Sequence, residues 1–311
     1  MMHKKYAFLF PGQGSQYVGM GKDFFEHFSS FRSTIQQAED ILSLDLSSLM
    51  FKGPEDELML TKNSQLAIYV LSVGILTVLN EQFPALTPAV CAGLSLGEYT
   101  ALTASGKISF TEALPLVFAR SHYMHDCCLN VPGSMLVILG MTEESIKAVL
   151  ESHNLREVWI ANLNCPGQVV IAGTENGLAS ASLILKENGA KRVLSLDVSG
   201  AFHSPLMQQA QNKLGAHIDE IKIHESSIDL VMNVPGDYVK EVSLIRSFMH
   251  RQVTECVRWE KGIRSIVNKG PHTYIEIGCG KTLSGMNKRI GVTDQTISLE
   301  TVKDLECLAH L

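Results

Sequence analysis

Residues 89–104 read AVCAGLSLGEYTALTA. The first four residues are small and apolar, which is typical of a short buried strand, and this run ends at Gly93. Residues 96–104 then favour a helix. A strand, a glycine-rich turn and a helix in this order predict an α/β fold.

The rest of the chain repeats this alternation of apolar runs and helical patterns, which also favours an α/β fold. We predict further strands at residues 6–10, 230–234 and 274–277. We predict helices at residues 65–79, 112–127, after Pro205, 244–254 and 261–268.

The middle of the chain has a pattern of its own. It predicts a strand at 135–139, a helix at 143–152, strands at 158–163 and 169–172, a helix at 178–188 and a strand at 192–198. The order β-α-β-β-α-β is the ferredoxin-like unit. We therefore predict a small ferredoxin-like domain at 130–198, inserted into a large α/β domain formed by 1–129 and 199–311.

Composition and charge exclude several classes of protein. Apolar residues make up 45% of the 311 residues and charged residues 19%, as in ordinary globular proteins, and the net charge of −6 gives no reason to expect nucleic-acid binding. The apolar run before Pro11 is too short for a signal peptide, and no run of 18 apolar residues predicts a membrane span. Seven cysteines without a Cys-x-x-Cys pair fit reduced thiols in the cytoplasm.

A candidate nucleophile lies in the stretch quoted first. Gly93, Ser95 and Gly97 match the pattern Gly-x-Ser-x-Gly, in which a strained turn between strand and helix exposes the serine hydroxyl. The helix N-terminus beneath the serine favours developing negative charge. A chance loop of small residues is the alternative for the motif alone.

Three other features could serve such a serine. Gly12 and Gly14 follow the first strand and could let backbone N–H groups turn inward as oxyanion donors, although a plain loop is the alternative. His203 lies where the chain returns to the large domain, and histidine titrates in the range of a general base. Arg120 lies in an apolar helix, where it either snorkels to solvent or binds a carboxylate through two hydrogen bonds.

Three apparent ligand motifs fail on inspection. Residues 278–282 resemble a phosphate loop, but Ile275 stands where that motif needs its first glycine. Gly12 and Gly14 resemble the start of a dinucleotide fingerprint, but Tyr17 stands at its third glycine position. His122 and His125 are three residues apart on a predicted helix without a third ligand. We therefore predict no metal site.

Together these motifs resemble the malonyl-CoA:acyl carrier protein transacylase family of fatty-acid synthesis. The segments that carry the resemblance are 12–16, 93–98, Arg120, 162–168, 202–205, Gln252 and 276–278. The resemblance implies a hydrolase-like core with a parallel sheet and an inserted ferredoxin-like domain. It implies a cytoplasmic enzyme that needs no cofactor, moves malonyl groups from malonyl-CoA to acyl carrier protein, releases coenzyme A, and binds no nucleic acid or membrane.

The resemblance also implies catalytic roles. Ser95 would be the nucleophile and His203 its base, with the carbonyl of Gln252 orienting the imidazole. Backbone N–H groups of Gln13 and Leu96 would form the oxyanion hole.

Substrate would be bound by four further residues. Arg120 would bind the free malonyl carboxylate, with Met124 and Asn162 beside it. Phe202 resembles the malonyl-selective pattern, because its bulk would crowd an additional methyl group. The chain departs from the common family pattern at Leu94, Cys165, Cys279 and His125, and none of these positions is a proposed catalytic group.

Three rival interpretations remain open at this level. A serine esterase or thioesterase would need an acid for its histidine, for which Asp197 could be considered, but it would have no use for a carboxylate-binding Arg120. The second rival interpretation is an acyltransferase for methylmalonyl or another extender unit. The third, a scaffold that only docks carrier protein, would not need Ser95, His203 and Arg120 together.

The sequence also offers a candidate docking region. Residues 251–289 carry eight basic and three acidic side chains within an acidic protein. Carrier proteins of this pathway are acidic, so this region could steer their docking. A solvated face without a partner is the alternative.

Overall fold

The structure, a computed structural model, describes residues 5–309 and contains two sheets. A six-stranded sheet has the order β10-β9-β1-β2-β7-β8, and a four-stranded sheet has the order β4-β5-β3-β6. The strands are β1 Tyr6–Phe10, β2 Pro88–Gly93, β3 Ser134–Leu139, β4 Val158–Cys165, β5 Gln168–Gly173, β6 Arg192–Ser195, β7 Asp229–Met232, β8 Asp237–Tyr238, β9 Thr273–Ile277 and β10 Thr296–Leu299. The predicted α/β class is confirmed.

Helices cover both sheets. They are α1 Lys22–His27, α2 Ser29–Leu42, α3 Leu46–Lys52, α4 Glu55–Met59, α5 Thr61–Gln82, α6 Gly97–Ala104, α7 Phe110–Asn130, α8 Glu143–Ser152, α9 Glu175–Glu187, α10 Gln208–Glu220, α11 Val242–Arg251, α12 Trp259–Asn268 and α13 Thr282–Ile290. Two 3-10 helices, Pro205–Met207 and Val302–Leu308, complete the described elements. The sequence patterns had not predicted α1–α4, β8, α13 or β10.

The six-stranded sheet is buried on both faces. Its neighbouring strands are parallel except for β7 and β8. Ala7 and Leu9 of β1 pack into the cluster that includes α12 and α13, whereas Phe8 and Phe10 pack into the larger cluster that includes α5 and α7. Because β1, β2 and β7 all run in the same direction, the loops that follow them meet at one edge, where parallel sheets usually bind ligands.

Helix α5 is the most apolar long helix and lies in the core. By length and composition alone it could cross a membrane, but 83% of its most apolar window is buried inside the protein. Two of its buried polar residues, Ser64 and Gln65, form hydrogen bonds with Gln13, which belongs to the site described below.

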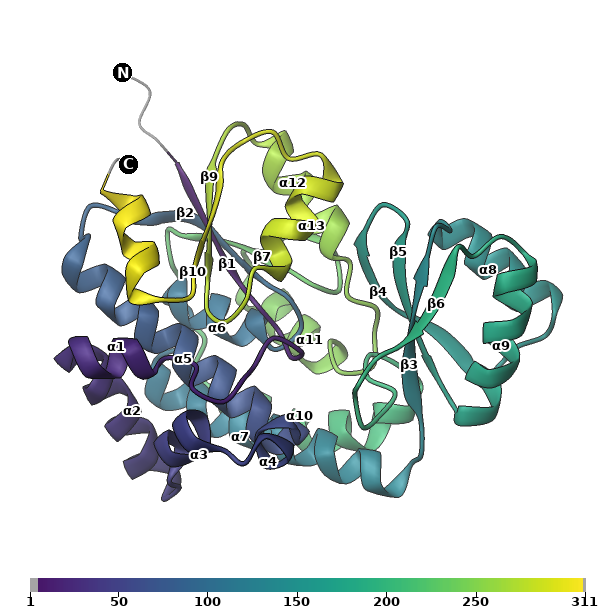
Figure 1. The fold of residues 1–311 in the computed structure, drawn as a ribbon, viewed down its shortest axis with the longest axis horizontal. Helices are drawn as coiled ribbons and strands as arrows, with labels where there is room; N and C mark the ends of the chain where they lie inside the picture. Colours follow the sequence, from purple (N-terminus) through teal and green to yellow (C-terminus); the bar gives the residue numbers. More distant parts are fainter. Residues whose placement is uncertain (1–4, 310–311) are drawn as a thin grey trace.

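The four-stranded sheet is antiparallel and follows the predicted order β3-α8-β4-β5-α9-β6. Figure 1 shows it to one side of the six-stranded sheet, with α8 and α9 on its outer face. Thr142 caps the N-terminus of α8, where its Oγ1 accepts a hydrogen bond from the Ser145 N–H at 3.2 Å. Thr174 caps α9 by accepting from the Gly177 N–H at 3.0 Å. This sheet and its helices share a separate apolar core.

Three predicted elements end earlier than expected, each for a visible reason. The strand predicted to reach residue 234 ends at Met232, because the next backbone N–H donates to Glu98. The helix predicted to reach 254 ends at Arg251, because Gln252 turns its carbonyl toward His203. The strand predicted to reach 198 ends at Ser195, near the point where its partner strand β3 begins.

Candidate active site

Ser95 sits on a tight turn between β2 and α6. Its φ of 52° lies in the left-handed region, which is uncommon for residues other than glycine and which recurs at active sites. A Cβ on Gly93 would lie 1.9 Å from the Gly97 carbonyl carbon, and a Cβ on Gly97 would lie 2.1 Å from the Phe10 carbonyl oxygen. Both glycines of the motif are therefore required for the turn to form.

Asn233, directly after β7, holds this turn from the neighbouring strand. Its Oδ1 accepts from the Ser95 N–H at 2.7 Å, and its Nδ2 donates to the Gly93 carbonyl at 2.7 Å. Its own backbone N–H donates to Oε2 of Glu98 at 2.6 Å. Asn233 was not predicted as a site residue, because it lies within the predicted strand 230–234; a polar side chain near the carboxyl end of that strand was the usable signal.

His203 lies between Ser95 and Gln252. Its Nδ1 must donate to the Gln252 main-chain carbonyl at 2.8 Å, since a carbonyl can only accept, so Nε2 is free to accept from the Ser95 hydroxyl at 2.8 Å. Burial, assisted by the charge of Arg120, lowers the pKa of His203 to about 4. Asp197 is exposed, and the Nδ1 position that an acid would occupy is taken by the carbonyl.

Arg120 is 0% exposed and reaches the same hydroxyl. Its Nη2 donates to Oε1 of Gln252 at 2.9 Å and lies 3.3 Å from Oγ of Ser95, and its Nη1 donates to Oε1 of Gln65. These three partners are neutral, and Nε has no hydrogen-bond partner within residues 5–309. The guanidinium is therefore a buried cation beside the serine, and the alternative of a snorkelling arginine is wrong.

Gln65 of α5 links Arg120 to the loop after β1. Its Nε2 donates to Oε1 of Gln13 at 3.1 Å and lies 3.6 Å from Sδ of Met124. Gln13 in turn donates to the Ser64 hydroxyl at 3.0 Å. Gln65 was not predicted as a site residue; a polar side chain next to the apolar run that begins at Leu66 was the signal that could have found it.

The two N–H groups expected in the oxyanion hole lie on adjoining loops. A Cβ on Gly12 would approach the Leu94 carbonyl oxygen to 2.6 Å, so the loop that carries Gln13 lies directly against the serine turn that carries Leu96. Neither the Gln13 nor the Leu96 backbone N–H has an acceptor in the described part of the chain. Both are therefore available to a ligand oxygen.

The remaining predicted substrate residues are placed less directly. Met124 is buried against Gln65, and Phe202 is buried immediately before His203. Asn162 lies in β4 and bridges Val257 through its main chain, with no side-chain hydrogen bond among residues 5–309. The structure thus groups Met124 and Phe202 with the serine site, whereas a role for Asn162 stays a prediction.

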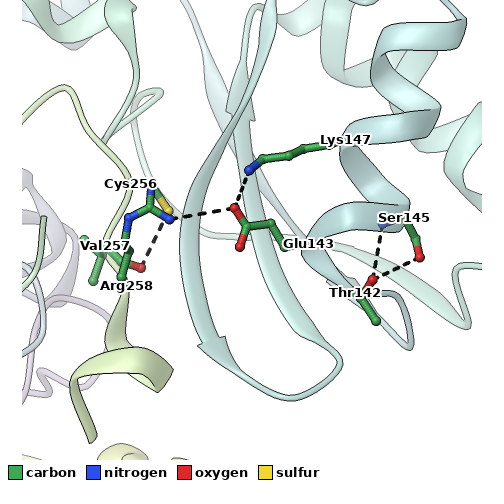
Figure 2. Close-up of polar contacts among 7 residues, drawn as sticks. All are labelled: Thr142, Glu143, Ser145, Lys147, Cys256, Val257 and Arg258. Atoms are coloured by element: carbon green, nitrogen blue, oxygen red, sulfur yellow. Dashed lines mark hydrogen bonds and ion pairs between the residues drawn. The ribbon is translucent and has the colours of Figure 1, made fainter. Parts of the chain in front are cut away.

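A cleft of about 570 Å³ leads to His203 between the two sheets. Its walls include Trp159 and Ile160 from β4. Figure 2 shows three of its lining residues: Oε1 of Glu143 lies 2.5 Å from Nζ of Lys147 and 3.7 Å from Nη1 of Arg258. The cleft therefore borders His203, whereas Ser95 and Arg120 are not among its lining residues.

Known proteins resemble this chain in sequence and in fold. Residues 7–298 match the family model described as the acyl transferase domain. The chain is 42% identical over 306 residues to the malonyl CoA-acyl carrier protein transacylase of Bacillus subtilis (strain 168). This match covers 97% of the chain and 95% of the relative. The chain belongs to the malonyl CoA-acyl carrier protein transacylase family.

Two further members extend the comparison. The transacylase of Escherichia coli (strain K12) is 37% identical, over 92% of this chain and 93% of that protein. A solved malonyl-transacylase in complex with a type II PKS acyl carrier protein is 36% identical, with a TM-score of 0.92 over 97% of this chain and 98% of that one. The resemblance inferred from the motifs is thus confirmed.

Proposed function

We propose that this chain transfers a malonyl group from malonyl-CoA to the phosphopantetheine thiol of an acyl carrier protein, through an ester on Ser95. The observation that carries the proposal is the Arg120 guanidinium, fully buried among neutral partners and 3.3 Å from the Ser95 hydroxyl. A buried cation whose hydrogen-bond partners are all neutral favours an anionic ligand. A malonyl thioester offers one carboxylate at a fixed distance from its reactive carbonyl.

The reaction divides into two half-reactions at one serine. His203 Nε2 takes the hydroxyl proton while Ser95 Oγ attacks the thioester carbonyl, and coenzyme A leaves with that proton as the free thiol. The carrier thiol then gives its proton to His203 and attacks the ester, which restores the serine hydroxyl. The N–H groups of Gln13 and Leu96 would stabilise the oxyanion in both steps.

Arg120 holds the carboxylate during both steps, and Gln252 holds both Arg120 and His203. Coenzyme A and the carrier share the pantetheine arm, and the cleft of about 570 Å³ that includes His203 is the route proposed for it. Met124, Asn162 and Phe202 would line the acyl pocket. The chemistry needs no metal or other cofactor, because the nucleophile, base and charge-stabilising groups are all side chains and backbone.

The finer description of the fold belongs to the same proposal. The six-stranded unit would be a hydrolase-like catalytic domain (1–129 and 199–311), and the strand order β4-β5-β3-β6 with two helices supports a ferredoxin-like domain at 130–198. Reduced cysteines fit a cytoplasmic enzyme, and we expect neither nucleic acid nor membrane among its partners.

Incubation with malonyl-CoA, with and without carrier protein, tests the proposal. We expect stoichiometric release of coenzyme A without carrier and sustained release with malonyl-carrier formation when carrier is present. Steady release of free malonate without carrier would instead identify a thioesterase. Preference for methylmalonyl-CoA would point to another extender unit, and no release at all would leave only a docking role.

A further inference from the structure

Glu98 lies directly beneath the serine turn and is only 1% exposed. It is the second residue of α6 and follows Gly97 of the turn. Its side chain does not contact Ser95 itself. Both of its carboxyl oxygens instead accept hydrogen bonds from residues that do.

One carboxyl oxygen holds Asn233. Oε2 of Glu98 accepts the Asn233 backbone N–H at 2.6 Å, and the Asn233 side chain clamps the Ser95 N–H and the Gly93 carbonyl at 2.7 Å each. The direction of these bonds fixes the amide: Oδ1 must face the N–H, and Nδ2 must face the carbonyl. The conformation of the serine turn thus depends on where Glu98 holds Asn233.

The other oxygen holds Gln252. Nε2 of Gln252 donates to Oε1 of Glu98 at 3.2 Å and to the Ser95 carbonyl at 2.8 Å, which leaves Oε1 of Gln252 to accept from Arg120 at 2.9 Å. An amide flip would place its NH2 group against the guanidinium. Glu98 therefore sets the orientation in which Gln252 can serve both Ser95 and Arg120.

We propose that Glu98 is a positioning residue for the transfer reaction, because its carboxylate orients Asn233 and Gln252 and, through them, Ser95 and Arg120. The inference rests on the proposed function. The ionised carboxylate is the stronger acceptor for both donors, since a protonated oxygen accepts more weakly and its proton must turn away from the N–H group. Protonation of Glu98 should therefore loosen one of the two contacts and slow acylation.

The surroundings of Glu98 place this change near neutral pH. Burial raises the pKa of Glu98 to about 8, against the opposing effects of the Asn233 N–H, the Arg120 charge and the Gln252 amide. Arg120 of α7 is the charged group that acts on it, and Tyr99 of its own helix is the titratable neighbour. The backbone N–H of Asn233, after β7, and the side chain of Gln252, after α11, also face it, and neither residue carries a charge.

The test is the pH dependence of Ser95 acylation by malonyl-CoA in wild type, Glu98→Gln and Glu276→Gln. Glu276 is the matched control: it is 0% exposed and accepts from the backbone N–H groups of Leu283 and Ser284 at 2.8 and 2.9 Å and from the Ser298 hydroxyl at 2.9 Å. Wild type and Glu276→Gln should lose rate as pH falls through about 8. Glu98→Gln should be about 10- to 100-fold slower at high pH, because a charge-assisted hydrogen bond is lost. Its acylation rate should not show this fall with decreasing pH.

A Glu98→Gln protein that keeps the wild-type rate and pH profile would overturn the inference. If that variant does not fold, the wild-type protein still decides, because a profile flat between about pH 6 and 9 contradicts the role of the carboxylate. Glu98→Asp, which keeps the charge, should retain a pH step. Failure of wild type to be malonylated at any pH would instead count against the proposed function.

Discussion

Nδ1 of His203 lies 2.8 Å from the main-chain carbonyl oxygen of Gln252. Serine hydrolases usually place a carboxylate at this position. A carbonyl fixes the same tautomer, but it carries no full negative charge, so its hydrogen bond raises the pKa of the imidazole by less than burial and the Arg120 charge lower it. The consequence is a histidine that stays neutral well below its ordinary range.

This relationship yields a prediction for His203 itself. Burial and the Arg120 charge lower the pKa of His203 to about 4, so its neutral, proton-accepting form persists as pH falls and is lost only near that value. NMR titration of the ring protons, assigned by comparison with His203→Gln, should show no His203 midpoint between about pH 6 and 7, the range of an ordinary histidine. A midpoint in that range would show that the imidazole is solvated or paired with an acid.

The serine turn gives a prediction about stability. Gly97→Ala places a Cβ 2.1 Å from the Phe10 carbonyl oxygen, and this backbone atom cannot move without displacing β1. We expect a loss of about 2–4 kcal/mol in the free energy of unfolding, measured with denaturant. Gly285 of α13 is the control, because nothing lies within 4 Å of its Cβ position. Gly285→Ala should be neutral or stabilise by up to about 1 kcal/mol, and equal effects of the two variants would contradict the crowding argument.

Much of this site was visible in the sequence, and the reason is locality. Ser95 lies in a motif whose strand, turn and helix are contiguous. His203 lies where the chain returns from the predicted small domain to the large domain. Glu98 was visible as part of the same segment, but nothing local assigned it a role. Asn233 and Gln65 act through side chains that meet Ser95 and Arg120 only after folding, across 138 and 55 residues, respectively.

Three short helices before α5 were missed for a different reason. Helices α1, α3 and α4 are five to seven residues long, and a single turn or two carries too few apolar positions to show a helical period. Conversely, the ends of β7 and α11 were overestimated because apolar residues recur after Met232 and Arg251, at Val234 and Val253. In the structure both elements end where Asn233 and Gln252 turn toward the site.

Arg120 should determine which acyl group is accepted. Malonyl and acetyl thioesters differ by one carboxylate, and two charge-assisted hydrogen bonds to a guanidinium could discriminate by about 10²- to 10⁴-fold. Arg120→Ala should lose malonyl transfer and keep or gain acetyl transfer, and Arg120→Lys should recover only part of the preference. The measurement is kcat/KM for malonyl-CoA and acetyl-CoA. An alanine variant that folds and keeps the wild-type ratio would place carboxylate recognition elsewhere.

Carrier docking should depend on only part of the basic region 251–289. Arg251 and Arg264 are engaged by glutamates one helical turn away, at 2.6 and 2.7 Å, whereas Lys281 and Lys288 are exposed and make no ion pair with residues 5–309. Lys281→Ala and Lys288→Ala should slow transfer to carrier protein more than Arg264→Ala does.

Added salt should weaken transfer to carrier protein more than acylation by malonyl-CoA, because the docking charges are exposed. Rates of the two half-reactions, measured separately across a salt series, provide the comparison. Equal salt sensitivity in both half-reactions, or equal effects of the three substitutions, would show that these lysines are a solvated surface.

The central claim is that Ser95 carries the malonyl group. Its hydroxyl lies 2.8 Å from Nε2 of His203, and its turn is held by Asn233, so an acyl group should attach there and nowhere else in the chain. Intact-protein mass spectrometry after brief incubation with malonyl-CoA measures this directly. Wild type should gain the mass of one malonyl group, and Ser95→Ala should gain none. A Ser95→Ala protein that is still malonylated to the same extent would contradict the account.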